Sequence, residues 1–160
     1  MAIDYFLKID GISGESVDAK HKGEIDVEAW SWGETHPASP GAGGGGGAGK
    51  VQMQDLNFSA KFSTASPDLI LACASGKHFK SAVLTARKAG KEQLEFLTFS
   101  LSDVLVSAYQ TGGVEGDVVP GDSVSLNFAK IQVEYKAQKP DGSLGASIKA
   151  GWDVKQNKQF

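Results

Sequence analysis

The sequence predicts a mainly β protein, built as a flattened β-barrel or a two-sheet sandwich of seven to nine strands with one short α-helix. Three observations support this: apolar and polar residues alternate with a period of two along most of the chain, turn residues recur at regular intervals, and a single segment carries helix start and stop signals. A chain of 160 residues is long enough for one full hydrophobic core. We therefore expect a single domain spanning residues 1–160.

The N-terminal segment "MAIDYFLKIDG" is predicted to be the first strand, with Ile3, Tyr5, Leu7 and Ile9 on one face. Asp4 stands where a signal peptide needs an unbroken apolar core, and Cys73 is the only cysteine, so we expect synthesis in a reducing cytoplasm. No run approaches the roughly 18 apolar residues of a membrane span, and membrane insertion is not expected. The turn "GISGES" precedes a second predicted strand over residues 24–32.

Residues 33–50 are predicted to form a long glycine-rich loop. This stretch has almost nothing apolar to bury, and seven glycines fall within residues 41–49, so the loop cannot become ordered through its own contacts. Its sequence "GAGGGGGAGK" also fits the first part of a phosphate-binding P-loop. That motif requires a helix after it and Ser or Thr after the lysine, whereas Val51 follows Lys50 and an alternating strand follows Val51. A flexible spacer is the better interpretation.

The middle of the chain holds the predicted helix, at residues 66–75 within "SPDLILACASG". Ser66 is the expected N-cap, with Pro67 in the first helical position and Gly76 just past the end. Because residues 69–73 are all apolar, we expect burial over most of its circumference. Before the helix, the alternation in residues 51–62 changes phase, which predicts a bulge near Gln54 or Asp55.

After the helix, the pattern predicts a hairpin around Ala89–Gly90, a further strand over residues 104–110 and a second long connection over 112–122. Residues 123–138 place apolar side chains first at even and then at odd positions. A strand that passes from one sheet to another changes its buried face in this way. The last predicted strand, residues 146–154, has Ile148, Ala150 and Trp152 on one face.

Charge and residue types exclude several functions. The formal net charge is −3 and the basic residues are interspersed with acids, so nucleic acid is not an expected partner. His21, His36 and His78 lie in predicted loops without partners at metal-ligand spacing, so we expect surface histidines, no metal and no cofactor. Asp26 and Glu28 share a strand face, which is more typical of a solvated face than of a paired-acid hydrolase. We do not expect an enzyme.

Tryptophans mark the second strand and the last one. In "AWSWG", Trp30 and Trp32 lie on one strand face and are expected to anchor the core or an interface, as is Trp152 near the C-terminus. Ser31 then faces whatever the opposite side of that sheet contacts.

Eight segments, in order along nearly the whole chain, together resemble the haemolysin-coregulated protein (Hcp) family, the tube subunits of the bacterial type VI secretion system. They are "MAIDYFLKIDGISGES", "EIDVEAWSWG", "GGGGGAGKVQMQD", "SPDLILACASGKH", "ARKAG", "VLVSAYQTGG", "SVSLNFAKIQVEYKAQ" and "GWD". The resemblance implies six-membered rings that stack into a hollow tube, capped by a spike protein and driven out by a contracting sheath. It also implies effectors carried in the lumen and export without a signal peptide.

This resemblance gives the candidate site residues their roles. Ser31 is expected to contact effectors in the lumen, and the loop is expected to contact a neighbouring ring or subunit through Gly33, His36, Gly43, Gly44, Gly45, Gly46, Gly47 and Lys50. The alternative is a monomeric β-barrel that binds a small ligand inside. That protein would need an apolar cavity, whereas many of the inward-facing residues here are large aromatics.

Overall fold

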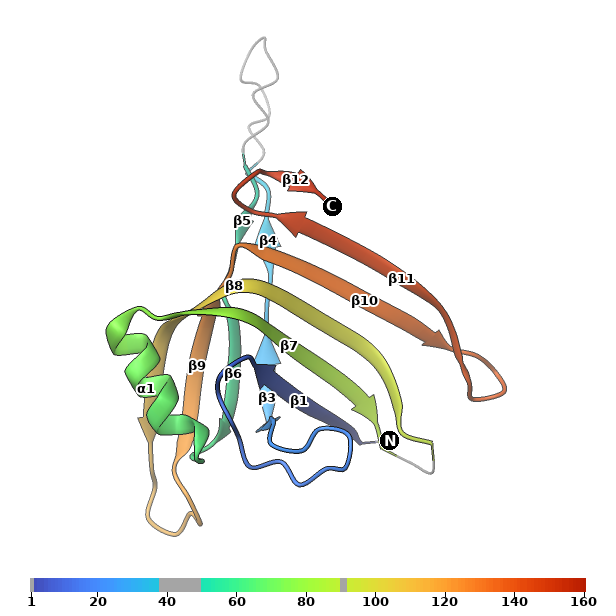
Figure 1. Ribbon diagram of the computed structural model, residues 1–160. Coiled ribbons are helices and arrows are strands. Elements are labelled where there is room, and N and C mark those ends of the chain that lie inside the picture. The colour runs from blue at the N-terminus through green and yellow to red at the C-terminus, as the bar shows by residue number, and fades with distance from the viewer. Residues whose placement is uncertain (1, 38–49, 90–91) are drawn as a thin grey trace.

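The computed structural model describes residues 2–37, 50–89 and 92–160 (Figure 1). Within these ranges the chain forms twelve strands and one helix, so the predicted mainly β fold with a single helix is confirmed. The elements are β1 (Ile3–Ile9), β2 (Ile25–Val27), β3 (Ala29–Ser31), β4 (Glu34–Thr35), β5 (Gln52–Met53), β6 (Leu56–Lys61), α1 (Ala65–Ser75), β7 (His78–Lys88), β8 (Leu94–Gly112), β9 (Gly121–Asn127), β10 (Lys130–Gln138), β11 (Leu144–Asp153) and β12 (Lys158–Gln159).

The strands form two layers joined by long strands that pass from one layer to the other. The first layer has the order β12-β11-β10-β8-β7-β1-β2, and the second consists of β3, β6 and β9. In β8, residues 97–102 pair with β10 while residues 105–112 pair with β9. The sheets are not closed into a barrel, so of the two predicted arrangements the sandwich is observed and the closed barrel is wrong.

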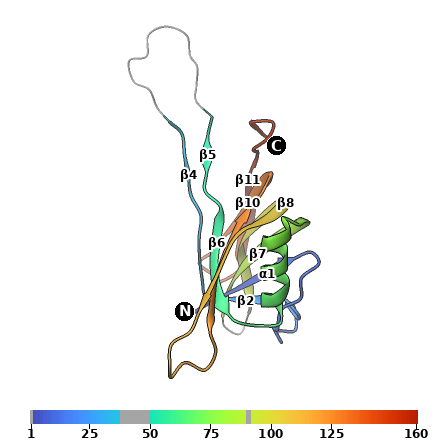
Figure 2. The same ribbon diagram turned by 90° about the vertical axis from the view of Figure 1, so that its left-hand side faces the viewer.

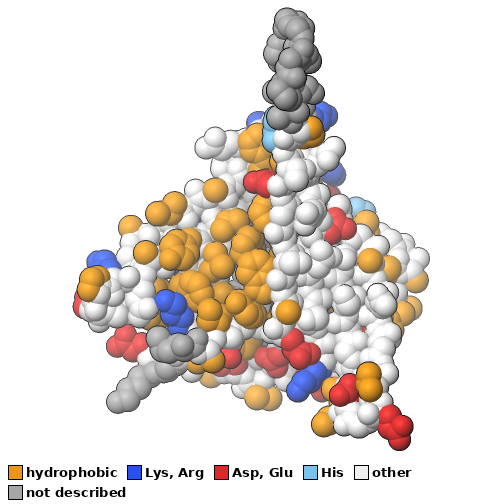
Figure 3. Space-filling model, turned by 180° about the vertical axis from the view of Figure 1, so that it is seen from behind, with side chains coloured by type: hydrophobic (Ala, Val, Ile, Leu, Met, Phe, Trp, Pro, Cys, Tyr) orange, Lys and Arg blue, Asp and Glu red, His pale blue; other side chains and the backbone are white. Residues whose placement is uncertain are grey.

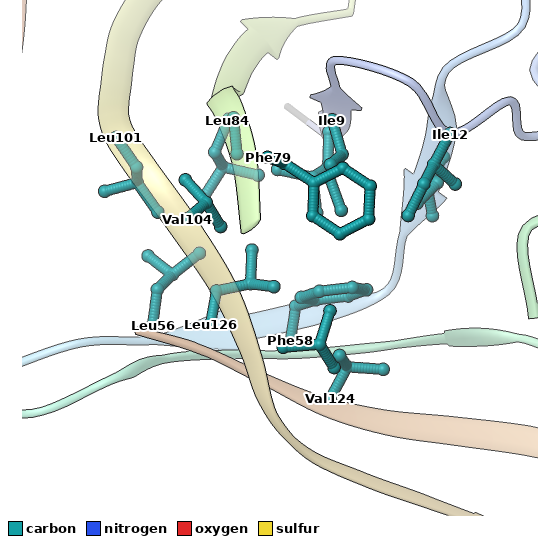
Figure 4. Close-up of a cluster of buried hydrophobic side chains, with 14 of the residues drawn as sticks. Ile9, Ile12, Leu56, Phe58, Phe79, Leu84, Leu101, Val104, Val124 and Leu126 are labelled. Atoms are coloured by element: carbon teal, nitrogen blue, oxygen red, sulfur yellow. The ribbon is translucent and has the colours of Figure 1, made fainter. Parts of the chain in front are cut away.

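The core lies between the two layers, as Figure 4 shows. The first layer contributes Leu84 and Leu101, and the second contributes Leu56 and Leu126, which face each other in the β6–β9 pairing. Alternation explains this arrangement, because in β6 and β9 every second side chain is buried, and all of these except Asp122 are apolar. The predicted change of face within residues 123–138 is confirmed: β9 belongs to the second layer and β10 to the first, with Phe128 and Ala129 between them.

Helix α1 has the predicted place but different contacts. It begins after Thr64, and Ser66 is not the N-cap; the buried Ser66 hydroxyl instead donates to Asp122 of β9 and accepts from the Ser63 amide. Gly76, in the left-handed conformation, ends the helix as predicted. Burial over most of the circumference was wrong. The helix packs at one end of the sheets (Figures 1 and 2), so Leu69 is buried while Leu71 is exposed.

Two further predictions need correction. The separate strand predicted over residues 104–110 is the second half of β8, which bends near Asp103, whose φ is 53°, without ending. The predicted loop over residues 33–50 begins with strand β4, which pairs with β5, because backbone hydrogen bonds can order polar residues that have no apolar contacts. Where a bulge was predicted near Gln54 or Asp55, the chain instead leaves the strand conformation between β5 and β6. Among the described residues, no helix is long and apolar enough to cross a membrane.

Leu126→Ala tests the two-layer core. Leu126 has no exposed surface, and truncating a fully buried leucine costs about 2–5 kcal/mol in the free energy of unfolding. The control is Val118→Ala, since Val118 is 97% exposed and its truncation should change stability by less than about 0.5 kcal/mol. Urea titration at one protein concentration measures both. Equal, small losses in the two variants would contradict the described core.

Candidate interaction surface

The first layer is wider than the layer that covers it. In β8, Leu97, Phe99 and Leu101 face the second layer and pair across to β10. Strands β10 and β11 continue the same face outward, beyond β3, β6 and β9. The apolar side chains on this continuation, which we call the overhang face, are Ile131, Val133 and Tyr135 of β10 and Trp152, Ala150 and Ile148 of β11.

Exposure rises along the overhang face with distance from the core. Ile131 is 3% exposed, whereas Tyr135 is 44% and Ile148 is 68% exposed. Figure 3 shows a broad apolar area on this side of the molecule. Contiguous apolar patches on soluble proteins are typical of sites that another molecule covers.

The opposite face of β10 and β11 is suited to water. Glu134 is 3.5 Å from the Lys149 ammonium and 3.6 Å from that of Lys136. These two strands therefore have one charged face and one apolar face, which is the pattern of strands that border a core. Along residues 144–150, the outer edge of β11 has no strand partner within the described part of the chain. Such an edge can pair with a strand of another chain.

A groove of about 760 Å³ lies between the overhang face and the base of the long loop. Val133, Ala150 and Trp152 line one side, and Trp32 and Met53 line the other. The lining is mostly apolar, with Glu34, Thr35 and His36 at the loop side.

Trp32 and Trp152, which both line the groove, have buried indole N–H groups without a hydrogen-bond partner in the described residues. A buried donor without an acceptor costs roughly 1–3 kcal/mol. The rings of Trp30 and Trp32 both pack against the Phe99 ring, at centroid distances of 5.0 and 6.2 Å. All three tryptophans are partly buried against the core. Sequence reasoning identified them but did not reveal the groove, which depends on how the loop base meets β10 and β11.

The structure places three of the predicted loop residues. Gly33 accepts a backbone hydrogen bond of 2.9 Å from Gln54, His36 is exposed at the groove, and Lys50 is exposed at the start of the second described range. The remaining predicted residues, Gly43, Gly44, Gly45, Gly46 and Gly47, lie outside the described residues.

The outer face of the second layer is polar and carries little charge. Ser31 is exposed on β3 and lies directly opposite Asn57 of β6, which in turn lies opposite Ser125 of β9 and accepts its hydroxyl hydrogen bond. Ser59, Ser123 and Asn127 continue this face, which we call the serine–asparagine face. Figure 3 shows it as a pale band descending from β4 and β5. The sequence analysis named only Ser31, although the alternation within "LNFSAK" and "SVSLN" carries the signal for the others.

Charged residues border the serine–asparagine face at both ends of β6: Lys61 ends the strand on the same face as Asn57 and Ser59, and Asp55 precedes the strand. Asp55 accepts hydrogen bonds from Ser107 at 2.5 Å and from Asn127 at 2.9 Å. Within the described ranges, no group of three or more His, Cys, Asp or Glu side chains is placed to hold a metal ion. The expectation that all histidines lie at the surface was wrong for His21, which is 7% exposed.

Comparison with known proteins decides the family. The family model described as "Type VI secretion system effector, Hcp" matches residues 6–135. The chain belongs to the Hcp family of the type VI secretion system. It is 50% identical to Protein hcp1 of Pseudomonas aeruginosa strain PAO1 over 161 residues, covering 99% of both chains.

Solved Hcp structures have the same fold. The crystal structure of Hcp1 from Salmonella typhimurium has a TM-score of 0.84 at 41% identity, with both chains fully covered. A second structure, described as a type six secretion system protein, has a TM-score of 0.92 at 29% identity over 99% of this chain and 100% of that one. The predicted family is thus confirmed, and this Hcp chain is a secreted structural protein.

Proposed function

We propose that this Hcp chain is a tube subunit: copies close into a hexameric ring, rings stack into a tube, and the lumen carries and protects effectors during export. The observation that carries the proposal is the uncovered overhang face. It has the composition of a core, lies beside an unpaired strand edge and borders a groove with two unpartnered indole donors. A neighbouring copy would bury the exposed apolar side chains of this face.

Copies form a ring if the contact at the overhang face is head-to-tail, that is, if it joins two different surfaces of neighbouring copies. In such a contact, the overhang face of one copy packs against a different surface of the next copy. A contact between two different surfaces repeats around an axis and closes if the rotation allows. The number six, the spike and sheath partners, and export without a signal peptide come from the family resemblance.

The serine–asparagine face is the proposed lumen lining. Hydroxyl and amide groups on small side chains offer hydrogen bonds without a net charge, so they can contact many different cargo proteins weakly. Ser31, Asn57 and Ser125 lie at its centre. No catalysis is proposed. The alternative, a monomeric barrel with an internal ligand, is disfavoured because the space between the two layers is filled by the core (Figure 4).

Ile148→Glu tests the assembly surface. The side chain is 68% exposed in the single chain, so the protomer should fold normally. In the ring, however, a carboxylate would be buried in an apolar contact at a cost of several kcal/mol. We expect the concentration needed for assembly to rise by roughly a hundredfold or more.

The matched control is Ser147→Glu, which places the same charge one residue away on the solvated face of β11. Native mass spectrometry should show hexamers for the wild type and Ser147→Glu, and smaller species for Ile148→Glu. Hexamers of undiminished stability in Ile148→Glu would place the ring contact elsewhere.

Deleting residues 38–47 tests the role of the long loop in stacking. Strands β4 and β5 extend from one end of the body (Figure 2), so a segment between them is placed to reach a neighbouring ring. Electron microscopy of the deletion variant should show single rings and no tubes, with hexamers retained in native mass spectrometry. Tubes of wild-type length would reject this role.

Ser31→Gln tests cargo contact. A longer side chain at an exposed position of β3 should leave the ring intact but crowd the proposed lumen. We expect retention of a cognate effector, measured by co-purification with the rings, to fall several-fold. Ser147→Gln, the same substitution on the outer face of β11, should retain the effector fully. Equal retention by the two variants would remove Ser31 from the cargo site.

A further inference from the structure

We propose that His21 is a proton-dependent clasp that fastens the surface loop 13–24 to β8. Both imidazole nitrogens lie at hydrogen-bond distance from carboxylates: Nδ1 is 2.8 Å from Glu24 Oε2 and Nε2 is 2.6 Å from Glu95 Oε1. Glu24 closes the loop itself, whereas Glu95 belongs to β8. The ring is 7% exposed and stacks on Phe6 of β1, with centroids 4.4 Å apart and planes 6° from parallel.

The number of protons in this cluster follows from the donor and acceptor inventory. A carboxylate only accepts hydrogen bonds, and a neutral imidazole has one N–H donor and one lone pair. Two carboxylates can therefore both bond to His21 only when the cluster holds one proton more than a neutral imidazole has. When that proton leaves, one nitrogen lone pair faces a carboxylate at less than 3 Å, and this contact becomes repulsive.

A second attachment of the same loop does not depend on that proton. The Arg87 guanidinium of β7 donates two hydrogen bonds to Asp18, of 2.8 and 2.7 Å, and lies over the Phe6 ring. Arg87 holds the pKa of Asp18 well below its usual value, so this pair stays charged at neutral pH. Asp18 also accepts from the backbone amides of Lys20 and His21.

The charged groups around the clasp are thus Glu24 and Asp18 from the loop, Glu95 from β8, Arg87 from β7 and Asp4 from β1, which is 3.8 Å from Arg87. Glu24 and Glu95 face His21, whereas Asp18 and Asp4 face Arg87. Neither Glu24 nor Glu95 has another side-chain hydrogen bond in the described residues. Glu24 is nearly buried and belongs to the same loop as His21, whereas the Glu95 side chain is 40% exposed and can turn to water. The β8 end of the clasp is therefore the end expected to open.

The loop can open without unfolding the sandwich. Its own backbone bonds, from Gly14 to Gly23 at 2.7 Å and from Ser16 to Glu24 at 3.0 Å, close it on itself. A Cβ atom at Gly14 would lie 2.5 Å from the Glu24 carbonyl oxygen, so glycine is needed for this approach. The loop lies toward the end of the molecule away from β4 and β5 (Figure 1). An effect on assembly, unlike the clasp itself, rests on the proposed function. In the proposed tube, this end of the molecule would face the next ring, and ring stacking would respond to pH.

Amide hydrogen exchange tests the clasp. Protection factors of the hydrogen-bonded loop amides of Ser16, Gly23 and Glu24 are measured from about pH 5.5 to about pH 8, the span over which imidazoles change charge. We expect them to fall roughly tenfold or more as pH rises, because a charge-assisted hydrogen bond is lost. Amides in the centre of β7 serve as the internal reference and should not change.

Glu95→Gln is the matched variant, because a glutamine amide can donate to the lone pair of a neutral imidazole. Its loop should stay protected across the whole range. His78→Gln alters an exposed histidine that is 2.9 Å from Asp103 and should keep the wild-type pH response. A wild-type loop whose protection does not change with pH, or a Glu95→Gln loop that still responds, would overturn the clasp. Neither result bears on ring formation, which native mass spectrometry reports separately.

Discussion

The structure depends on a mismatch between two layers of unequal width. Three strands of the second layer cover the inner part of the first, and β10 and β11 extend past them with the same apolar face. The covered part supplies the core that holds the protomer together. The uncovered part is as apolar as a core but lies at the surface. Its apolar side chains are therefore removed from water only when another molecule covers them.

The same mismatch arranges the other functional surfaces. Because β4 and β5 continue directly from the second layer, the base of the long loop forms one wall of the groove whose other wall is the overhang face. Because β3, β6 and β9 bury every second residue against the first layer, their remaining residues form the serine–asparagine face. A one-residue change of register in these three strands would exchange their buried residues with the proposed lumen lining.

The sequence was sufficient to predict which side chains of a strand are buried. It was not sufficient to predict contacts between segments that are distant in the chain. Leu56 and Phe58, Val124 and Leu126, and the change of face at Phe128–Ala129 were all readable, since alternation reports directly which side of a strand is buried. The exposure of Leu71 could not be predicted, because a run of apolar residues does not show which sides of a short helix pack against other elements. His21 was missed because its partner Glu95 is distant in sequence. The groove was missed for the same reason, since its walls come from residues 32–36, 51–53 and 131–157.

The most direct measurement is an electron cryomicroscopy structure of the assembled protein at side-chain resolution. The account predicts that a neighbouring copy covers Val133 and Ile148. An assembly in which the overhang face remains in contact with solvent, with copies joined through other surfaces, would contradict it.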